Sequence, residues 1–210
     1  MSAGPRIAVL DYGIGNLRSA EKALQHVGAA ARLVSDVVSV ESADAVVLPG
    51  VGAFGACARA LRESSLEMPV RAAIDAGVPF FGVCVGFQLL YDGSVESPGA
   101  TGLGVFPGTV GRLPPGVKHP QMQWNRLEPR GSGEPAPLRG LGERPWVYFV
   151  HSFAPPVGEE TAATCDYGGP VAALAVRGSL WGAQFHPEKS GTTGLALLAN
   201  FVSSVTAAAA

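Results

Sequence analysis

The sequence predicts a three-layer α/β fold: a central, mostly parallel sheet, helices on both of its faces, and an antiparallel extension in the C-terminal half. Three observations favour this fold. Short apolar runs alternate with helix-spaced segments through the first half of the chain. The run 78–83 is unbroken, as in a strand buried on both faces of a parallel sheet. The second half carries apolar runs with little helix between them.

The first half alternates strands and helices. Each expected strand is a short apolar run, and these runs are 6–10, 31–34, 45–48 and 78–83. Each expected helix has a helical pattern of apolar residues, and these segments are 17–27, 56–63 and 69–77. Gly28 and Gly77 are expected to end two of the helices, because glycine adopts the left-handed C-cap conformation at no steric cost.

In the second half, Pro- and Gly-rich turns separate the apolar runs. These runs are 109–113, 146–153, 171–176 and 180–185, and we expect strands that extend the same sheet in an antiparallel or mixed arrangement. The polar segment 131–137 is expected to be a surface loop, and 193–205 the last helix. We therefore expect one domain over 1–210, with frayed ends at 1–5 and 206–210.

Composition narrows the classes of function. With 210 residues, of which 47% are hydrophobic and 15% charged, the chain can bury a large core. Its formal net charge of -2 argues against a nucleic-acid partner, which would need a basic face. The first apolar run, 7–10, is far too short for an export signal or a membrane span, so we expect neither a leader nor a membrane partner.

The three cysteines are widely separated, without a Cys-x-x-Cys pair, which predicts neither a disulfide framework nor a zinc site. A reducing, cytoplasmic setting fits this pattern. Cys57 and Cys165 have no special surroundings and are expected to be structural.

No cofactor or metal is expected. His26 and His119 have no carboxylate or cysteine at metal-ligand spacing. Gly13 and Gly15 follow the first strand, but Arg18 stands where a dinucleotide-binding fingerprint needs its third glycine.

The sharpest local feature is Cys84, which stands between Gly82 and Gly86 directly after the expected strand 78–83. A residue at a sharp strand-to-helix turn, with small neighbours, forms a nucleophile elbow. A thiol at the start of a helix also lies near unpaired N–H groups, which favour the thiolate. A cysteine that only packs in a core needs no glycine on either side, so we predict that Cys84 is a nucleophile.

His186 is the candidate base, in the Gln-Phe-His-Pro-Glu segment 184–188. Alternate residues of an extended segment face the same side, so Glu188 can reach the His186 ring and fix its tautomer. His186 would then accept the Cys84 proton and pass it to the leaving group. Alone, this segment fits a structural histidine equally well, but beside the elbow it favours a catalytic pair. His151 lies among aromatic residues and is expected to be structural.

The Pro-Gly-Val-Gly segment 49–52 follows another strand and offers backbone N–H groups. An N–H of Val51 or Gly52, together with that of Val85, would form an oxyanion hole. The same glycines are compatible with a tight turn that needs positive φ, and both interpretations can hold at once.

Taken together, these residues resemble the class I glutamine amidotransferases, and within them the glutaminase subunits of imidazole glycerol phosphate synthase. The elbow and the His-Pro-Glu segment are shared by all class I members. The Asn16 turn, the Tyr148 segment and Lys189 are what point to this subunit. The resemblance covers nearly the whole chain, and the segments that carry it are 11–17, 49–54, 82–86, 124–125, 148–152 and 184–190.

What the resemblance implies is the class I amidotransferase fold and a coupled reaction. L-glutamine is hydrolysed at Cys84 through a glutamyl thioester, and ammonia passes to a (β/α)8-barrel cyclase subunit in an expected one-to-one heterodimer. The cyclase makes imidazole glycerol phosphate and an aminoimidazole carboxamide ribotide in histidine biosynthesis. The glutaminase is expected to be nearly idle until the cyclase binds its ligand, because the segment 50–52 must first turn an N–H toward the oxyanion.

The resemblance also implies roles for further residues. Those expected to hold glutamine are Gly52, Gln88, Glu96, Ser152 and Phe153. Those expected to face the cyclase, around the ammonia exit, are Asn16, Trp124, Tyr148 and Lys189.

Some positions depart from the family pattern. Val85 and Phe87 replace Leu and Met at the elbow, and Phe153 replaces Tyr at the rim of the site. Gln121 and Gln123 stand where His and Gly are expected, in a segment expected to face the partner. None of these changes removes a catalytic group.

Three alternatives fit part of the pattern. Another amidotransferase, serving for example anthranilate or pyridoxal phosphate synthesis, would share the triad but not the Asn16 turn or Lys189. A stand-alone cysteine hydrolase, such as a γ-glutamyl peptidase, would be fully active alone. A non-catalytic binding module would have no use for Cys84, His186 and Glu188 together. These residues favour the partner-dependent glutaminase.

Overall fold

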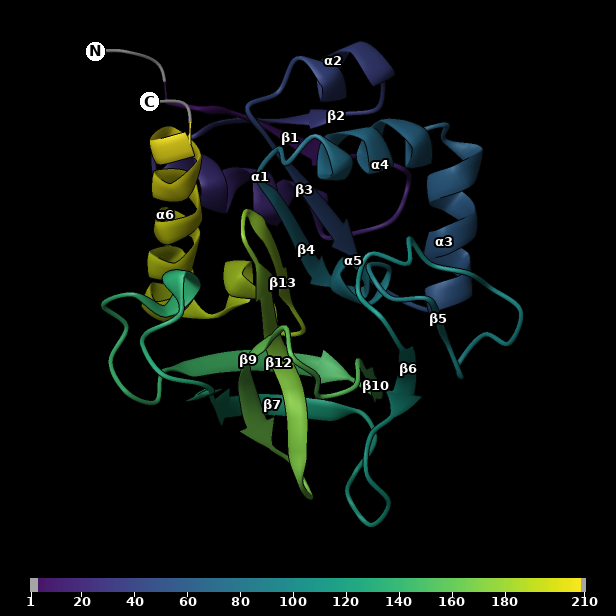
Figure 1. Ribbon diagram of the computed structural model, residues 1–210, viewed down its shortest axis with the longest axis vertical. Coiled ribbons are helices and arrows are strands. Elements are labelled where there is room, and N and C mark those ends of the chain that lie inside the picture. The colour runs from purple at the N-terminus through teal and green to yellow at the C-terminus, as the bar shows by residue number, and fades with distance from the viewer. Residues whose placement is uncertain (1–3, 209–210) are drawn as a thin grey trace.

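The computed structural model describes residues 4–208, and an eight-stranded sheet runs through the molecule (Figure 1). Five neighbouring strands are parallel, in the order β2 (Ala30–Val34), β1 (Arg6–Leu10), β3 (Ala45–Gly50), β4 (Phe80–Cys84) and β13 (Leu180–Ala183). The sheet continues through antiparallel pairs with β12 (Pro170–Arg177), β11 (Thr161–Asp166) and β8 (Glu128–Pro129). The predicted mostly parallel sheet with an antiparallel extension is confirmed.

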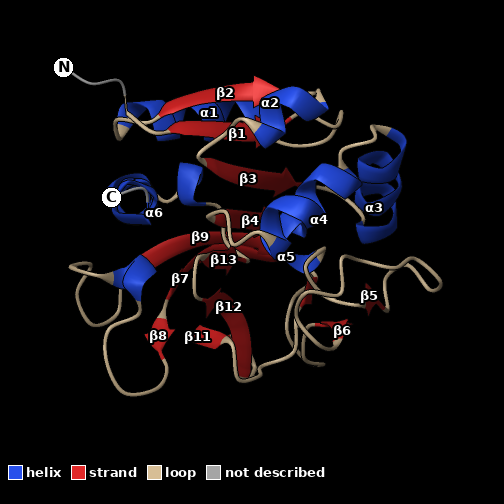
Figure 2. Ribbon diagram, turned by 45° about the horizontal axis from the view of Figure 1, so that its top comes forward, coloured by secondary structure: helices blue, strands red, loops and turns tan. Residues whose placement is uncertain are grey.

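Helices cover both faces of the parallel strands (Figure 2). On one face, α1 (Leu17–His26) contacts α6 (Gly191–Ala208), and on the other α2 (Val37–Glu41) contacts α4 (Glu67–Asp75). The remaining two are α3 (Phe54–Glu63) and the short α5 (Val85–Gln88). The three-layer arrangement predicted from the sequence is therefore present.

Two apolar runs of the second half do not join this sheet, so the prediction that they extend it is wrong for them. β9 (Trp146–His151) pairs with β7 (Gln121–Arg126) as a separate antiparallel ribbon. β6 (Thr109–Arg112) pairs with β5 (Gly93–Ser94) and β10 (Phe153–Ala154). Most of β7 is exposed, which suits a ribbon rather than an interior strand.

The ends of the chain were expected to fray at 1–5 and 206–210, and part of these ranges lies outside the described residues. Within the described part, the Pro5 carbonyl accepts a hydrogen bond from the Ala30 N–H at 2.9 Å. The last helix, α6, continues to Ala208.

Helix α6 has 18 residues and a mean hydropathy of 1.2, so by length and composition it is the one helix within residues 4–208 that could cross a membrane. Its apolar side faces the protein, where it contacts α1, β9 and the 3-10 turn η1 (Ala136–Leu138). Phe201 packs on Phe81 and Trp181 with ring centroids 5.3 Å apart in both pairs. These contacts pack one side of α6 against the protein core.

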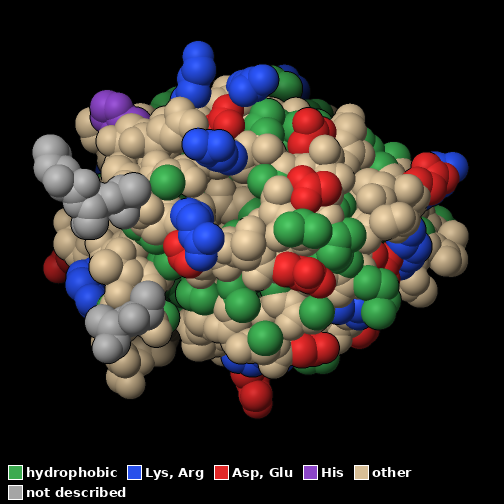
Figure 3. Space-filling view, turned by 90° about the horizontal axis from the view of Figure 1, so that it is seen from above, with side chains coloured by type: hydrophobic (Ala, Val, Ile, Leu, Met, Phe, Trp, Pro, Cys, Tyr) green, Lys and Arg blue, Asp and Glu red, His purple; other side chains and the backbone are tan. Residues whose placement is uncertain are grey.

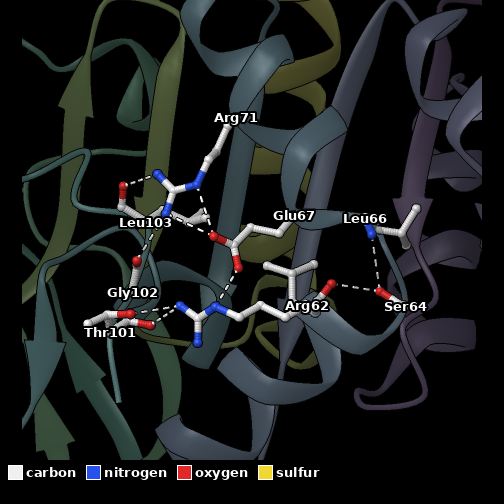
Figure 4. Close-up of polar contacts among 9 residues, drawn as sticks. Arg62, Ser64, Leu66, Glu67, Arg71, Thr101, Gly102 and Leu103 are labelled. Atoms are coloured by element: carbon white, nitrogen blue, oxygen red, sulfur yellow. Dashed lines mark hydrogen bonds and ion pairs between the residues drawn. The ribbon is translucent and has the colours of Figure 1, made fainter. Parts of the chain in front are cut away.

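An ion cluster ties α3 and α4 to the chain that follows α5 (Figure 4). Glu67 accepts hydrogen bonds from Nε of Arg62 at 2.8 Å and from Nε of Arg71 at 3.0 Å. The two arginines donate onward, Arg62 to the Thr101 carbonyl at 2.6 Å and Arg71 to the Leu103 carbonyl at 2.7 Å. The cluster therefore anchors one end of the loop between α5 and β6.

Figure 3 shows the molecule from above, with Lys and Arg side chains interspersed among Asp and Glu. No broad patch of one sign covers this face. Such a mixture is typical of a surface that faces water.

Candidate active site

Cys84 lies where β4 turns into α5. Its φ of 55° and ψ of -113° fall in a region that residues other than glycine avoid. A Cβ on Gly86 would overlap the Leu48 carbonyl oxygen of β3, and a Cβ on Gly82 would lie 2.8 Å from the Gly86 oxygen. The flanking glycines are thus sterically required, and they form the sharp turn that the sequence predicts.

His186 follows β13, the parallel neighbour of β4, so its ring lies beside Cys84 at the same edge of the sheet. Its Nδ1 is 2.9 Å from Oε1 of Glu188, and the two side chains are only 3% and 5% exposed. Asn16 also donates to this Glu188 oxygen, at 3.3 Å. Burial lowers the pKa of His186, but hydrogen bonds with Cys84 and Glu188 and their charges outweigh it and raise the pKa above its ordinary 6.5.

A second set of hydrogen bonds fixes the backbone of His186. Its N–H donates to the Tyr148 carbonyl of β9 at 3.0 Å, and the Ser190 hydroxyl donates to its carbonyl at 2.7 Å. The Tyr148 N–H donates to the same hydroxyl at 3.0 Å. The base and the β7–β9 ribbon are therefore one hydrogen-bonded unit.

A cavity of about 330 Å³ opens beside Cys84. The predicted site residues that line it are Val51, Gly52, Cys84, Val85, Gln88, Glu96, Ser152, Phe153, His186 and Lys189. Its size and mixed lining suit a small polar molecule. A hollow of about 380 Å³ beneath α2, lined by Arg6 and Arg32 among others, has neither cysteine nor histidine in its lining.

Two predicted glutamine-binding side chains are held in place by hydrogen bonds. Gln88 donates from Nε2 to the Phe153 carbonyl at 2.9 Å and to Gln184 Oε1 at 3.0 Å. Oε2 of Glu96 accepts from the Phe54 N–H at the start of α3 at 2.8 Å. Gln184, which sequence analysis did not assign, is fully buried, with its Nε2 3.8 Å from the Cys84 sulfur.

Sequence comparison places this site in a known family. The family model described as glutamine amidotransferase class-I matches residues 8–205. The chain belongs to the class I glutamine amidotransferase family. It is 48% identical over 203 residues to imidazole glycerol phosphate synthase subunit HisH of Deinococcus radiodurans, covering 95% of this chain and 94% of that relative.

Other comparisons agree. Subunit HisH of Synechococcus elongatus is 46% identical over 213 residues, with 99% of this chain and 97% of that relative covered. A crystal structure of a glutamine amidotransferase superposes with a TM-score of 0.75 at 25% identity, over 95% of this chain and 98% of that one. Among class I amidotransferases, the chain thus groups with the HisH subunits.

The residues of this amidotransferase that were expected to face a partner all lie next to the segment 188–191. Trp124 of β7 and Tyr148 of β9 pack ring against ring, with centroids 6.1 Å apart, outside the cavity. Lys189 lines the cavity, and Asn16 donates to Glu188.

Gln121, one of the departures from the family pattern, lies in the interior and not on the surface that was expected to face the partner. Gln121 was expected to face the partner, but it is fully buried, with Nε2 3.8 Å from the Cys165 sulfur. It stands at the covered end of β7, opposite His151. Gln123 is exposed, as expected of a partner-facing position.

His151 also lines the cavity of this amidotransferase, although the sequence favours a purely structural role. Its Nδ1 donates to the Phe153 carbonyl at 2.9 Å, which leaves Nε2 as a bare acceptor. That nitrogen is buried and has no hydrogen-bond partner within residues 4–208. Burial and, to a smaller extent, the charge of nearby His186 lower the pKa of His151 to about 4, so the ring is neutral at pH 7.

This neutral histidine makes stability depend on pH. As pH falls from about 6.5 to about 4, His151 becomes protonated in the unfolded chain but stays neutral in the folded chain. The free energy of unfolding therefore falls over this range. At about 1.4 kcal/mol per pH unit, the loss reaches roughly 3 kcal/mol. His151→Asn keeps an N–H near Nδ1 but does not titrate. We expect urea unfolding to show the stability of wild type falling relative to this variant over that range; a constant difference would contradict the expectation.

Proposed function

We propose that this amidotransferase is the glutaminase subunit of imidazole glycerol phosphate synthase, which hydrolyses L-glutamine and passes the ammonia to a cyclase subunit. The observation that carries the proposal is the strained Cys84 beside a buried His186–Glu188 pair in a cavity the size of an amino acid. Such a constellation suits acyl transfer from an amide.

In the first half of the reaction, the Cys84 sulfur attacks the γ-carbonyl carbon of glutamine. His186 takes the thiol proton, and Glu188 holds the resulting imidazolium through Nδ1. The carbonyl oxygen becomes an oxyanion, which backbone N–H groups of Val51 or Gly52 and of Val85 stabilise. The C–N bond then breaks, His186 gives its proton to the departing nitrogen, and a glutamyl thioester and ammonia remain.

In the second half, water attacks the thioester. His186 takes a proton from the water and returns it to the Cys84 sulfur as the C–S bond breaks. Glutamate leaves, and the net reaction adds one water to glutamine and releases one ammonia. The raised pKa of His186 favours its uptake of the thiol proton, which the ring then holds until the departing nitrogen takes it.

Substrate is held on the side of the cavity away from His186. The Glu96 carboxylate can pair with the α-ammonium group of glutamine, and Gln88 with Gly52, Ser152 and Phe153 can bind the rest of the amino acid. The ion cluster of Arg62, Glu67 and Arg71 supports this arrangement, because it anchors the loop that carries Glu96.

We place the cyclase on the β7–β9 ribbon, as a single partner per chain. Met122 and Trp124 of this ribbon are 61% and 47% exposed, a degree typical of apolar side chains that a partner covers. Lys189 lines the cavity, and Asn16 contacts the catalytic Glu188. The Tyr148 carbonyl accepts from the His186 N–H and the Tyr148 N–H donates to Ser190, so a partner on this ribbon would be linked directly to the base.

We place this reaction in the cytoplasm. Cys57, Cys84 and Cys165 are free and buried, which fits a compartment that keeps thiols reduced.

The first experiment is glutamate release from glutamine by the purified chain, alone and with the cyclase subunit of the same organism plus its nucleotide ligand. The proposal expects negligible release from the chain alone and strong release from the liganded complex. Full activity of the isolated chain would favour a free-standing hydrolase instead. Activation by another synthase, but not by this cyclase, would assign the chain to a different amidotransferase.

A further inference from the structure

The backbone segment 49–52 stands directly opposite the nucleophile. The ladder between β3 and β4 ends at the pair Gly50 and Cys84, so the residues after Gly50 have no strand partner in that ladder. Val51 and Gly52 nevertheless line the cavity, and Val51 is 37% exposed. Something other than the sheet must set the direction of their peptide groups.

Two buried side chains supply that control. The Tyr12 hydroxyl donates to the Pro49 carbonyl at 2.6 Å, and the Cys57 thiol donates to the Val51 carbonyl at 3.2 Å. Tyr12 comes from the loop after β1 and Cys57 from α3, and they are 5% and 0% exposed. Burial raises the pKa of Cys57 to about 11, so the sulfur keeps its proton and stays a donor at neutral pH.

The direction of the Val51 carbonyl also fixes the direction of the Gly52 N–H, because both belong to the peptide between Val51 and Gly52. A trans peptide is planar, with its C=O and N–H pointing in opposite directions. Because the Val51 oxygen points to the Cys57 thiol of α3, the Gly52 N–H points away from that thiol, and Gly52 itself lines the cavity. Gly52 itself has a φ of 84°, which frees the chain to leave the strand direction there.

We propose that Cys57 is a positioning residue of this amidotransferase: its thiol holds the Val51 carbonyl and, together with Tyr12, sets the backbone that supplies the oxyanion donor facing Cys84. This inference rests on the proposed glutaminase reaction. Cys57 touches neither substrate nor nucleophile in this scheme, and it acts only through the segment 49–52.

Cys165 offers a matched control within the same chain. It too is a free cysteine with no exposed surface, but it lies on β11, and its sulfur contacts Gln121 Nε2 at 3.8 Å. Truncating either cysteine removes a similar buried volume. Only the change at Cys57 removes a hydrogen-bond donor to the segment 49–52, which we call the oxyanion segment.

The test compares Cys57→Ala, Cys57→Ser and Cys165→Ala in the complex with cyclase and its ligand. Ser and Ala are nearly equal in volume and differ by the hydroxyl donor. We expect Cys57→Ala to lower kcat about tenfold with little change in KM for glutamine, a part of the hundredfold or more that a lost oxyanion donor costs. Cys57→Ser is expected to recover most of the loss, and Cys165→Ala to keep wild-type kcat.

A tetrahedral inhibitor gives a second readout. Glutamate γ-semialdehyde adds the Cys84 sulfur to its aldehyde carbon, and the resulting hemithioacetal oxygen occupies the oxyanion position. We expect its inhibition constant to rise about tenfold in Cys57→Ala, while that of the product glutamate stays unchanged. A merely structural role for Cys57 would lower thermal stability without separating these two constants.

The outcomes are distinct. If wild type releases glutamate but Cys57→Ala keeps its kcat and its affinity for the aldehyde, the inference is wrong and the glutaminase assignment stands. Equal losses in the Ser and Ala variants would also overturn it, because the donor would then not matter. If wild type releases no glutamate in the complex, the proposed function itself fails. Should Cys57→Ala not fold, Tyr12→Phe removes the other donor, and an unchanged kcat there would overturn the inference.

Discussion

Replacing Cys84 by alanine is expected to lower kcat for glutamine hydrolysis at least about a thousandfold in the cyclase complex, with the fold intact. The reason is that Cys84 is the only cysteine among the residues that line the cavity. Glutamine binding to this variant, measured by calorimetry, is expected to persist, since Gln88 and Glu96 remain. Residual activity near wild type would show that Cys84 is not the nucleophile.

The same position provides a control from backbone strain. A φ of 55° is costly for any residue with a Cβ and costs glycine little. Urea unfolding is therefore expected to give Cys84→Gly a free energy of unfolding about 1 kcal/mol higher than that of Cys84→Ala. Both variants lack the thiol, so both are expected to be inactive. Equal stability of the two would contradict a strained elbow.

The elbow could be predicted because its signal is local. Gly82 and Gly86 are needed where β3, β4 and α5 approach each other, and these constraints appear in sequence as glycines around one cysteine. The parallel strands were predictable for a similar reason, because a strand buried on both faces reads as an unbroken apolar run.

What the sequence left open depends on contacts between distant segments. The pairing of β7 with β9 in its own ribbon follows from neither strand alone, since both runs would also fit the edge of the main sheet. His151 and Gln121 face each other across that ribbon, so their burial could not be read from either segment. The contact of the Cys57 thiol with the Val51 carbonyl spans only six residues, but it depends on how the turn after β3 directs α3.

Replacing Gly86 by alanine is expected to destabilise the protein by about 3 kcal/mol or more and to lower kcat at least about a hundredfold. A Cβ there would overlap the Leu48 carbonyl oxygen, which belongs to the backbone of β3 and cannot rotate away. Either α5 or β3 must move, and β3 leads directly into the oxyanion segment 49–52.

Gly111→Ala is the matched control, because a Cβ at Gly111 in β6 meets no atom within 4 Å. Urea unfolding is expected to leave Gly111→Ala within about 0.5 kcal/mol of wild type. If Gly86→Ala were equally mild, the close approach of β3 to the elbow would not be what positions Cys84.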